Sequence, residues 1–264
     1  MRRAAPVLWL ALLTVPLAGY ALISVQEEIA IGRQAQQRVR KDLPVVSDRR
    51  VVSYVTSIGR RIASRAGGPR YPYSFSMANY KEINAFALPG GPIWINRGAL
   101  QAATNEAQLA GVLAHEVAHI SRRHAADQLT TRLVADGLLG LLGAVLGNDR
   151  SARAAQAGAQ VLAGGYMLKF SRDDEREADR VGAEIVRRAG WDAHGLLEFM
   201  EILQRQQGRD PSSVDVFLSS HPAPAERAAL LRKASRTGGR RNSQEFQRVK
   251  ARLRQLPPAR TMPR

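Results

Sequence analysis

Three ionisable residues interrupt an otherwise apolar stretch at residues 105–124, NEAQLAGVLAHEVAHISRRH. Asn105 followed by Gln108 is typical of a capping box, and the apolar residues that follow recur at helical spacing, which predicts a helix. His115 and His119 lie one turn apart, so both imidazoles can bind one metal ion. Glu116 falls near the apolar face, where a buried carboxylate is costly unless a cation lies close. The chain must therefore fold around a buried polar centre, and a metal ion with water would satisfy all three side chains.

The chain contains no cysteine, so disulfides, Cys-ligated metals and a thiol nucleophile are excluded. A catalytic zinc site usually has three protein ligands and a water. In one known arrangement, a glycine lies three residues after the second histidine and a third histidine lies six residues after it. Here Ala125 and Arg122 occupy those positions, so that arrangement is excluded. His124 lies one residue before the position that this arrangement requires, and on a different face of the helix. We interpret it as a helix-end residue.

A second predicted helix, over residues 171–190 (SRDDEREADRVGAEIVRRAG), offers a carboxylate instead. Ser171 suits its N-cap and Gly190 its C-terminal end. At about 100° per residue, Glu175 and Asp179 are the two carboxylates that fall on its apolar face. We predict Glu175 as the third zinc ligand, with Asp179 accepting a hydrogen bond from a ligand histidine and fixing its tautomer. A buried ion pair with an arginine is the alternative explanation.

Short strands are predicted among the helices. Residues 26–65 have helical periodicity, and residues 73–77, 85–88 and 93–95 have the character of strands. We therefore expect an α+β fold that is mostly helical, with a small β-sheet beside the active-site helix. The strand Ile93, Trp94 and Ile95 could pair with an extended substrate through its backbone, or be an ordinary sheet strand.

The N-terminal sequence MRRAAPVLWLALLTVPLAGYALISVQEE places two arginines before an uncharged apolar stretch. This pattern is typical of an export signal, although the stretch is also long enough for an uncleaved membrane anchor. A buried N-terminal helix is the third interpretation. A second apolar stretch, residues 133–147, is short for a membrane span and predicts a buried or lid helix, or a hairpin that contacts a membrane.

The formal net charge of +16 suggests a nucleic-acid partner, but its distribution does not. Residues 232–264 contain 11 Lys or Arg and one acid, whereas residues 22–231 carry 26 basic and 22 acidic groups. The predicted export signal also argues against a nucleic-acid partner. In the tail, Phe246, Val249, Leu253 and Leu256 form one apolar stripe among basic residues. This pattern predicts a docking helix, contact with an anionic membrane, or a solvated basic helix packed by one edge.

Four sequence blocks, taken in order, resemble a known family. They are NAFALPGGPIWINRGAL (84–100), LAGVLAHEVAHISRRH (109–124), SRDDEREADRVG (171–182) and HPAPAER (221–227). Over residues 26–235 the chain resembles the gluzincin metallopeptidases related to the HtpX heat-shock peptidases and CAAX prenyl endopeptidases, and most of all their exported bacterial members. The resemblance implies a zincin-like fold and one Zn2+ held by His115, His119 and Glu175. Larger relatives carry an added helical-repeat domain, and HtpX has a pair of N-terminal membrane spans. We expect neither feature here.

The resemblance implies a zinc-dependent endopeptidase that hydrolyses unfolded or misfolded envelope proteins. Zinc lowers the pKa of its water toward about 7, and Glu116 takes the water proton and passes it to the leaving amine. His221 lies outside any periodic run, and we predict that it approaches the metal, either stabilising the oxyanion or as a fourth ligand that keeps the enzyme latent. Arg227 would support the transition state or form a structural pair.

The predicted organisation is a signal peptide or membrane anchor in residues 1–23, a zinc metallopeptidase domain in 24–236 and a basic tail in 237–264. The expected location is the periplasm, or the inner membrane facing the periplasm. The expected partners are unfolded or misfolded polypeptides and an anionic membrane surface bound by the tail, with no nucleic acid. The alternative function is a zinc-stabilised periplasmic chaperone or assembly factor with little or no proteolysis. Glu116 argues against it, because a structural zinc needs no base.

Overall fold

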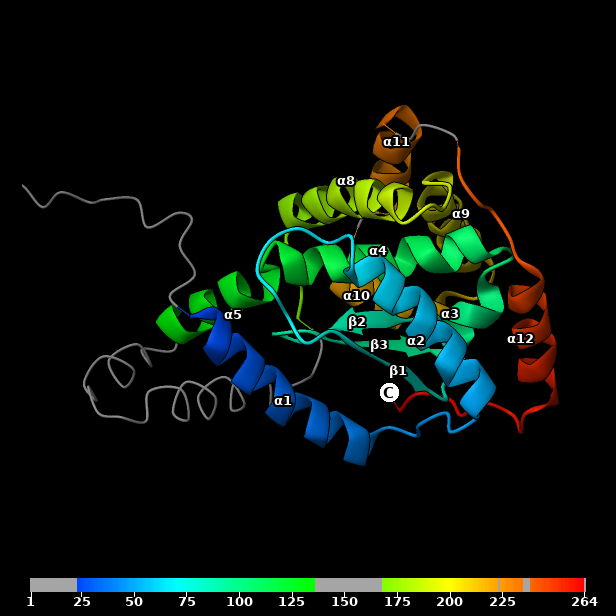
Figure 1. Cartoon of the computed structure of the whole chain (residues 1–264), viewed down its shortest axis with the longest axis horizontal. Helices are drawn as coiled ribbons and strands as arrows, with labels where there is room; N and C mark the ends of the chain where they lie inside the picture. Colours follow the sequence, from blue (N-terminus) through cyan, green and yellow to red (C-terminus); the bar gives the residue numbers. More distant parts are fainter. Residues whose placement is uncertain (1–22, 136–167, 223, 235–237, 264) are drawn as a thin grey trace, which may run out of the picture.

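The computed structural model describes residues 23–135, 168–222, 224–234 and 238–263 (Figure 1). The predictions for the N-terminal segment up to residue 22, and for residues 136–147 of the second apolar stretch, lie outside the described residues. In the part that is described, no helix combines the length and the apolar character needed to cross a membrane.

The described elements form a mostly helical α+β fold, as predicted. One three-stranded sheet has the order β1-β3-β2, with β3 parallel to β1 and antiparallel to β2. The strands are β1 (Ser74–Ala78), β2 (Ala85–Ala87) and β3 (Pro92–Asn96). The helices are α1 (Val25–Asp42), α2 (Arg49–Ala63), α3 (Arg97–Ala102), α4 (Glu106–Ser121), α5 (His124–Ala135), α8 (Arg172–Arg188), α9 (His194–Arg209), α10 (Asp215–Ser220), α11 (Pro224–Ala234) and α12 (Gln244–Gln255), and a 3-10 turn covers Pro211–Ser213.

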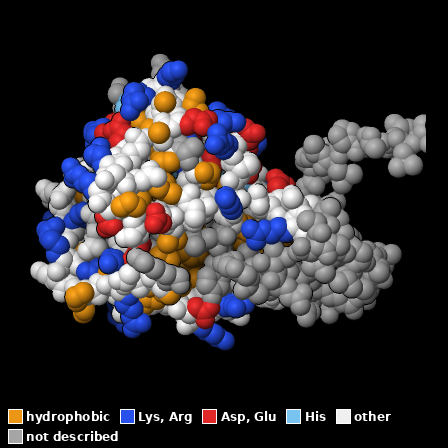
Figure 2. All heavy atoms as spheres, turned by 180° about the vertical axis from the view of Figure 1, so that it is seen from behind, with side chains coloured by type: hydrophobic (Ala, Val, Ile, Leu, Met, Phe, Trp, Pro, Cys, Tyr) orange, Lys and Arg blue, Asp and Glu red, His pale blue; other side chains and the backbone are white. Residues whose placement is uncertain are grey.

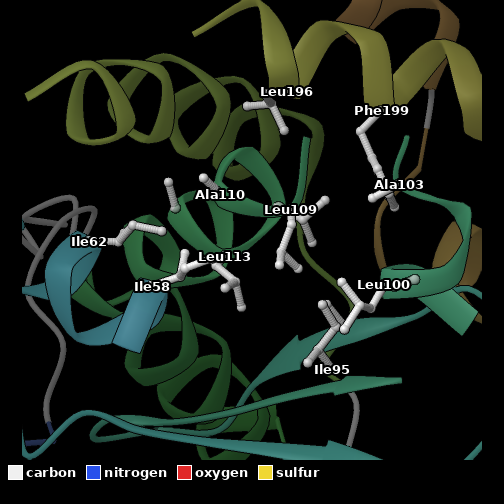
Figure 3. Close-up of a cluster of buried hydrophobic side chains, with 14 of the residues drawn as sticks. Ile58, Ile62, Ile95, Leu100, Ala103, Leu109, Ala110, Leu113, Leu196 and Phe199 are labelled. Carbon is white, nitrogen blue, oxygen red and sulfur yellow. The ribbon is translucent and has the colours of Figure 1, made fainter. Parts of the chain in front are cut away.

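Helix α4 forms the centre of the molecule. It packs against α8 and α9 on one side and against α2 and β2 on the other (Figure 1). Every residue of α4 is buried, so this helix lies inside the core and has no solvent-facing side. Figure 3 shows apolar side chains of α2, α4 and α9 meeting around Leu109 and Leu113. A helix held on all sides places its polar residues with little freedom to move.

The ends of α4 and α8 follow the sequence signals with one difference. The Asn105 side chain accepts a hydrogen bond from the Gln108 N–H (3.0 Å), but Gln108 turns its own oxygen to the Thr104 N–H (2.7 Å). Only one half of the predicted capping box is therefore made at α4. Ser171 caps α8 with a complete box, and Gly190 has the left-handed φ of +91° expected just beyond a helix end.

The sheet corrects the substrate-strand prediction. Strand β3 is central, and its Trp94 pairs with Ser76 of β1 on one side and Phe86 of β2 on the other. Both backbone edges of Ile93, Trp94 and Ile95 are thus already hydrogen-bonded, and a substrate cannot pair there. These residues form the ordinary sheet strand that was the alternative, and β2 lies at the edge of the sheet.

The tail contains a docked helix. In α12, Phe246, Val249 and Leu253 are fully buried, and the helix packs against α2 and α3. The Arg252 Nε lies 2.8 Å from a carboxylate oxygen of Asp48, the N-cap residue of α2. The apolar stripe is therefore used within the protein, as expected both for a docking helix and for a solvated basic helix packed by one edge. On the face seen in Figure 2, basic side chains are spread over the surface with acidic ones among them.

Candidate metal centre

Side chains from three parts of the chain meet in one buried cluster. His115 and His119 come from α4, Glu175 from the first turns of α8, and His221 from the residue after α10. The Nε2 atoms of His115 and His119 are 3.0 Å apart. Glu175 Oε1 is 3.4 Å from His119 Nε2 and 2.9 Å from His221 Nδ1. None of the four side chains is more than 1% exposed, so the sequence brings these residues together away from solvent.

The cluster fits a zinc ion in both chemistry and spacing. Zinc prefers nitrogen and carboxylate-oxygen ligands at about 2.0–2.2 Å in a tetrahedron, whose corners are then about 3.3 Å apart. The contacts between the cluster atoms are 2.9–3.5 Å, and one candidate ligand atom from each residue lies within 4.8 Å of every other. Three histidines and one carboxylate therefore form a site suitable for a single zinc ion.

Aromatic side chains hold two of the histidines from outside. The Phe170 ring stacks on His119 with centroids 3.9 Å apart, and Phe217 stacks on His221 at 4.6 Å. The His221 N–H also donates to the Phe217 carbonyl (2.8 Å), which fixes the chain where α10 ends. At His115, the close approach of α8 depends on Gly182, since a Cβ there would lie 3.1 Å from the His115 Cα.

Asp179 and Arg227 support the cluster from behind. His115 Nδ1 lies 3.0 Å from Asp179 Oδ1, which is the contact expected of a residue that fixes the tautomer of a ligand histidine. Arg227 donates from Nε and Nη2 to the two Asp179 oxygens at 2.7 Å each, and its Nη1 lies 2.6 Å from Glu175 Oε2. The buried ion pair considered as an alternative to a metal site is thus present together with the ligand cluster.

The local environment shifts the pKa values of the cluster. Burial opposes the charged form of Glu175, but His221, Arg227 and hydrogen bonds from the α4 histidines hold its pKa well below its usual range. Burial and Arg227 oppose protonation of His115, yet hydrogen bonds with Asp179 and Glu175 raise its pKa to about 9. Burial lowers the pKa of His119. The carboxylate is therefore ionised and can bind a cation, and a cation bound at His115 would displace a proton from that ring.

Glu116 is different from the other buried acids. It is 0% exposed, and neither of its carboxylate oxygens has a hydrogen-bond partner among the described residues. His221 Nε2 lies 3.7 Å from Glu116 Oε1. Burial raises its pKa above the ordinary value of a glutamate. A carboxylate of this kind, beside a metal cluster but outside the ligand set, is placed to exchange a proton with a water molecule.

Sequence reasoning gave His124 no part in the site, but the structure places it against the cluster. It is 3% exposed, and its Nδ1 lies 2.9 Å from Nδ1 of His119. The prediction assumed one continuous helix, in which residue 124 faces away from residue 119. Instead α4 ends at Ser121 and Arg123 adopts a left-handed conformation (φ 66°). No pattern in a single sequence indicates that an arginine has a left-handed backbone conformation, so the contact between His124 and His119 could not be predicted.

The mostly helical fold, the small sheet and the buried histidine–glutamate cluster define a zincin-like metallopeptidase. The chain belongs to peptidase family M48, whose family model matches residues 50–235. It is 32% identical to the beta-barrel assembly-enhancing protease of Escherichia coli (strain K12) over 215 residues, which are 80% of this chain and 44% of that protein.

Two other relatives are more distant. The mitochondrial metalloendopeptidase OMA1 of Schizosaccharomyces pombe is 29% identical over 201 residues, 74% of this chain and 58% of the relative. The metalloprotease YcaL of Escherichia coli (strain K12) is 26% identical over 191 residues, 70% of this chain and 73% of the relative. The chain thus spans less than half the length of the assembly-enhancing protease that it matches.

Proposed function

We propose that the chain is a zinc-dependent endopeptidase that hydrolyses peptide bonds of unfolded or misfolded envelope proteins. The observation that carries the proposal is the buried carboxylate of Glu116, which has no hydrogen bond to any described residue and lies beside a cluster suited to one zinc ion. The relatives bear the names of proteases, and one is named for β-barrel assembly. The N-terminal sequence supports export to the periplasm. The narrower likeness to the HtpX and CAAX endopeptidases stays a prediction from the motifs.

The chemistry divides between a bound ion and the side chains around it. When bound, zinc supplies a Lewis acid that polarises the scissile carbonyl and makes water a stronger acid. Glu116 accepts the proton of the attacking water, because a carboxylate with a raised pKa holds a proton more readily near neutral pH. It then delivers that proton to the leaving amine. Asp179 and Arg227 keep His115 and Glu175 in position during both transfers.

His221 would control whether water can reach a bound ion. Structural zinc sites usually have four protein ligands, whereas catalytic sites keep one position open. The Nδ1 of His221 lies 2.9 Å from Glu175 Oε1, in the position of a fourth ligand. We propose that this histidine holds the enzyme latent and that displacement of the His221 side chain opens the site. The same four-residue set favours the second candidate function, a zinc-stabilised chaperone or assembly factor.

The substrate path is proposed from the sheet. Strand β2 packs against α4 and, among the described residues, pairs with β3 alone. Its three residues are buried, so a peptide could reach this edge only after the segments that cover it had moved. An extended peptide that adds to this edge would bind through its backbone, which suits unfolded clients of varied sequence.

Contact of the tail with an anionic membrane stays a proposal as well. It predicts salt-sensitive sedimentation with anionic liposomes that weakens when the exposed Arg248 and Arg254 are changed to glutamine.

The test of the proposed function is cleavage of an unfolded protein by the purified, zinc-loaded chain. Glu116→Gln should lower the rate by about 100- to 10,000-fold, the usual contribution of general acid–base catalysis. Glu184→Gln, a change on the exposed surface of α8, is the matched control and should cleave like the unchanged protein. His221→Ala should cleave faster if this residue keeps the enzyme latent. Absence of cleavage by both the unchanged protein and His221→Ala, with one zinc bound, would support the assembly-factor function.

A further inference from the structure

His119 makes a second contact on the side of its ring away from the cluster. Its Nε2 faces His115 and Glu175, whereas its Nδ1 lies 2.9 Å from His124 Nδ1. The other ring nitrogen of His124, Nε2, lies 3.1 Å from Glu177 Oε2 on α8. A continuous row of polar contacts therefore runs from the cluster through two imidazoles to a carboxylate.

Only one arrangement of protons satisfies all of these contacts. If Nε2 of His119 binds a cation, that atom has no proton, so the proton of the neutral ring lies on Nδ1. The Nδ1–H must donate to His124 Nδ1, which therefore carries a lone pair. The proton of His124 then lies on Nε2 and donates to Glu177. A proton on Nδ1 of His124 would instead set two N–H groups against each other at 2.9 Å.

The backbone takes an unusual path to place His124 there. Arg123, between α4 and α5, has a φ of 66°, a left-handed conformation that is unfavourable for a side chain of this size. Its side chain is held by Glu28 of α1, with Nε donating to Oε1 at 2.6 Å. Glu28 is 1% exposed and also accepts a hydrogen bond from the Tyr71 hydroxyl at 2.8 Å. Side chains from outside α4 and α5 thus maintain the turn that returns residue 124 to residue 119.

We propose that His124 is a positioning residue of the metal centre, which accepts the Nδ1–H of His119 and so holds the ligand ring in its metal-binding tautomer and orientation. Asp179 has the same relation to His115 on the opposite side of the cluster. Hydrogen bonds of this kind, from ligand histidines to an outer acceptor, typically change metal affinity by about 10- to 100-fold when they are removed. The inference rests on the proposed function only in that the cluster must bind zinc.

A matched pair of substitutions separates hydrogen bonding from packing. Asparagine and leucine have nearly the same shape, and the asparagine Oδ1 takes a position close to that of a histidine Nδ1. His124→Asn therefore keeps an acceptor for His119, whereas His124→Leu fills a similar volume without one. His194→Ala, a change of a partly exposed histidine beside Asp192, controls for loss of an imidazole elsewhere. Zinc affinity of the purified full chain is measured by competition with a chromophoric chelator, and thermal unfolding of the zinc-free proteins checks the fold.

We expect His124→Leu to bind zinc about 10- to 100-fold more weakly than the unchanged protein. His124→Asn should bind more tightly than His124→Leu, and His194→Ala should match the unchanged protein. Equal zinc affinity in the asparagine and leucine variants would overturn the inference, whether both are strong or both are weak. Failure of the unchanged protein to bind zinc would instead overturn the proposed function, and this inference with it. Because zinc affinity is measured without a substrate, lack of cleavage alone leaves the inference standing.

Discussion

Replacing Arg227 by methionine tests how the buried charges around the cluster are balanced. Arg227 is 2% exposed and contacts two buried carboxylates, Asp179 through two hydrogen bonds of 2.7 Å and Glu175 at 2.6 Å. Methionine has a similar length and no charge, so both carboxylates lose their cation. Removal of one partner of a buried ion pair costs about 3–5 kcal/mol. At about 2–4 °C per kcal/mol for a domain of this size, the melting temperature should fall by about 6–20 °C.

A second arginine of the same helix provides the control. Arg232 contacts Glu201 at the same distance, 2.7 Å, but its side chain is 59% exposed. Arg232→Met should therefore cost at most about 1 kcal/mol. Thermal and urea unfolding are measured with a chelator present, and again with excess zinc, which should reduce the loss in Arg227→Met because a bound dication faces Glu175. Equal destabilisation by the two substitutions in chelator would refute the reasoning.

Two further predictions concern the docked tail. Phe246→Ala removes a fully buried aromatic ring from α12 and should lower the free energy of unfolding in urea by about 3–5 kcal/mol. A loss below about 1 kcal/mol would mean that α12 does not unfold together with the rest of the domain. The hydrogen bond from the Val51 N–H and the pairing with Arg252 lower the pKa of Asp48. This stabilisation is complete above the unfolded-state pKa of about 3.9 and is lost as pH falls through the lower native pKa. Asp48→Asn should therefore be less stable than the unchanged protein at pH 7 and converge with it in acid, and a difference independent of pH would contradict this explanation.

Local patterns in the sequence were sufficient for the three strands, for helices α4 and α8 and for most of the cluster. Two histidines one turn apart on an apolar helix, and two carboxylates on the apolar face of a second helix, lie together because each helix has one way to bury its apolar residues. The same reasoning predicted that Asp179 accepts a hydrogen bond from a ligand histidine, and the structure identifies that histidine as His115. Periodicity also located the short strands.

Contacts between distant segments were beyond the reach of the same patterns. The order of the three strands depends on pairing, so the sequence of Ile93, Trp94 and Ile95 did not show that the strand is central. The position of His124 depends on a left-handed residue held by Glu28, almost a hundred residues earlier in the chain. The docked position of the tail likewise depends on distant contacts, since Lys250 donates hydrogen bonds to the Leu100 and Ala103 carbonyls near the end of α3. In each case a remote partner determines the role of the residue.

The most direct test of the account compares zinc binding by two variants that make the same chemical change. Glu116→Gln and Glu175→Gln each replace one buried carboxylate by an amide, but only Glu175 belongs to the proposed ligand set. After dialysis against a weak chelator, elemental analysis should find one zinc per chain in the unchanged protein and in Glu116→Gln, and a clear loss of zinc in Glu175→Gln. Full zinc content in both variants, or loss of zinc from Glu116→Gln, would contradict the assignment of the cluster as the zinc site and of Glu116 as its base.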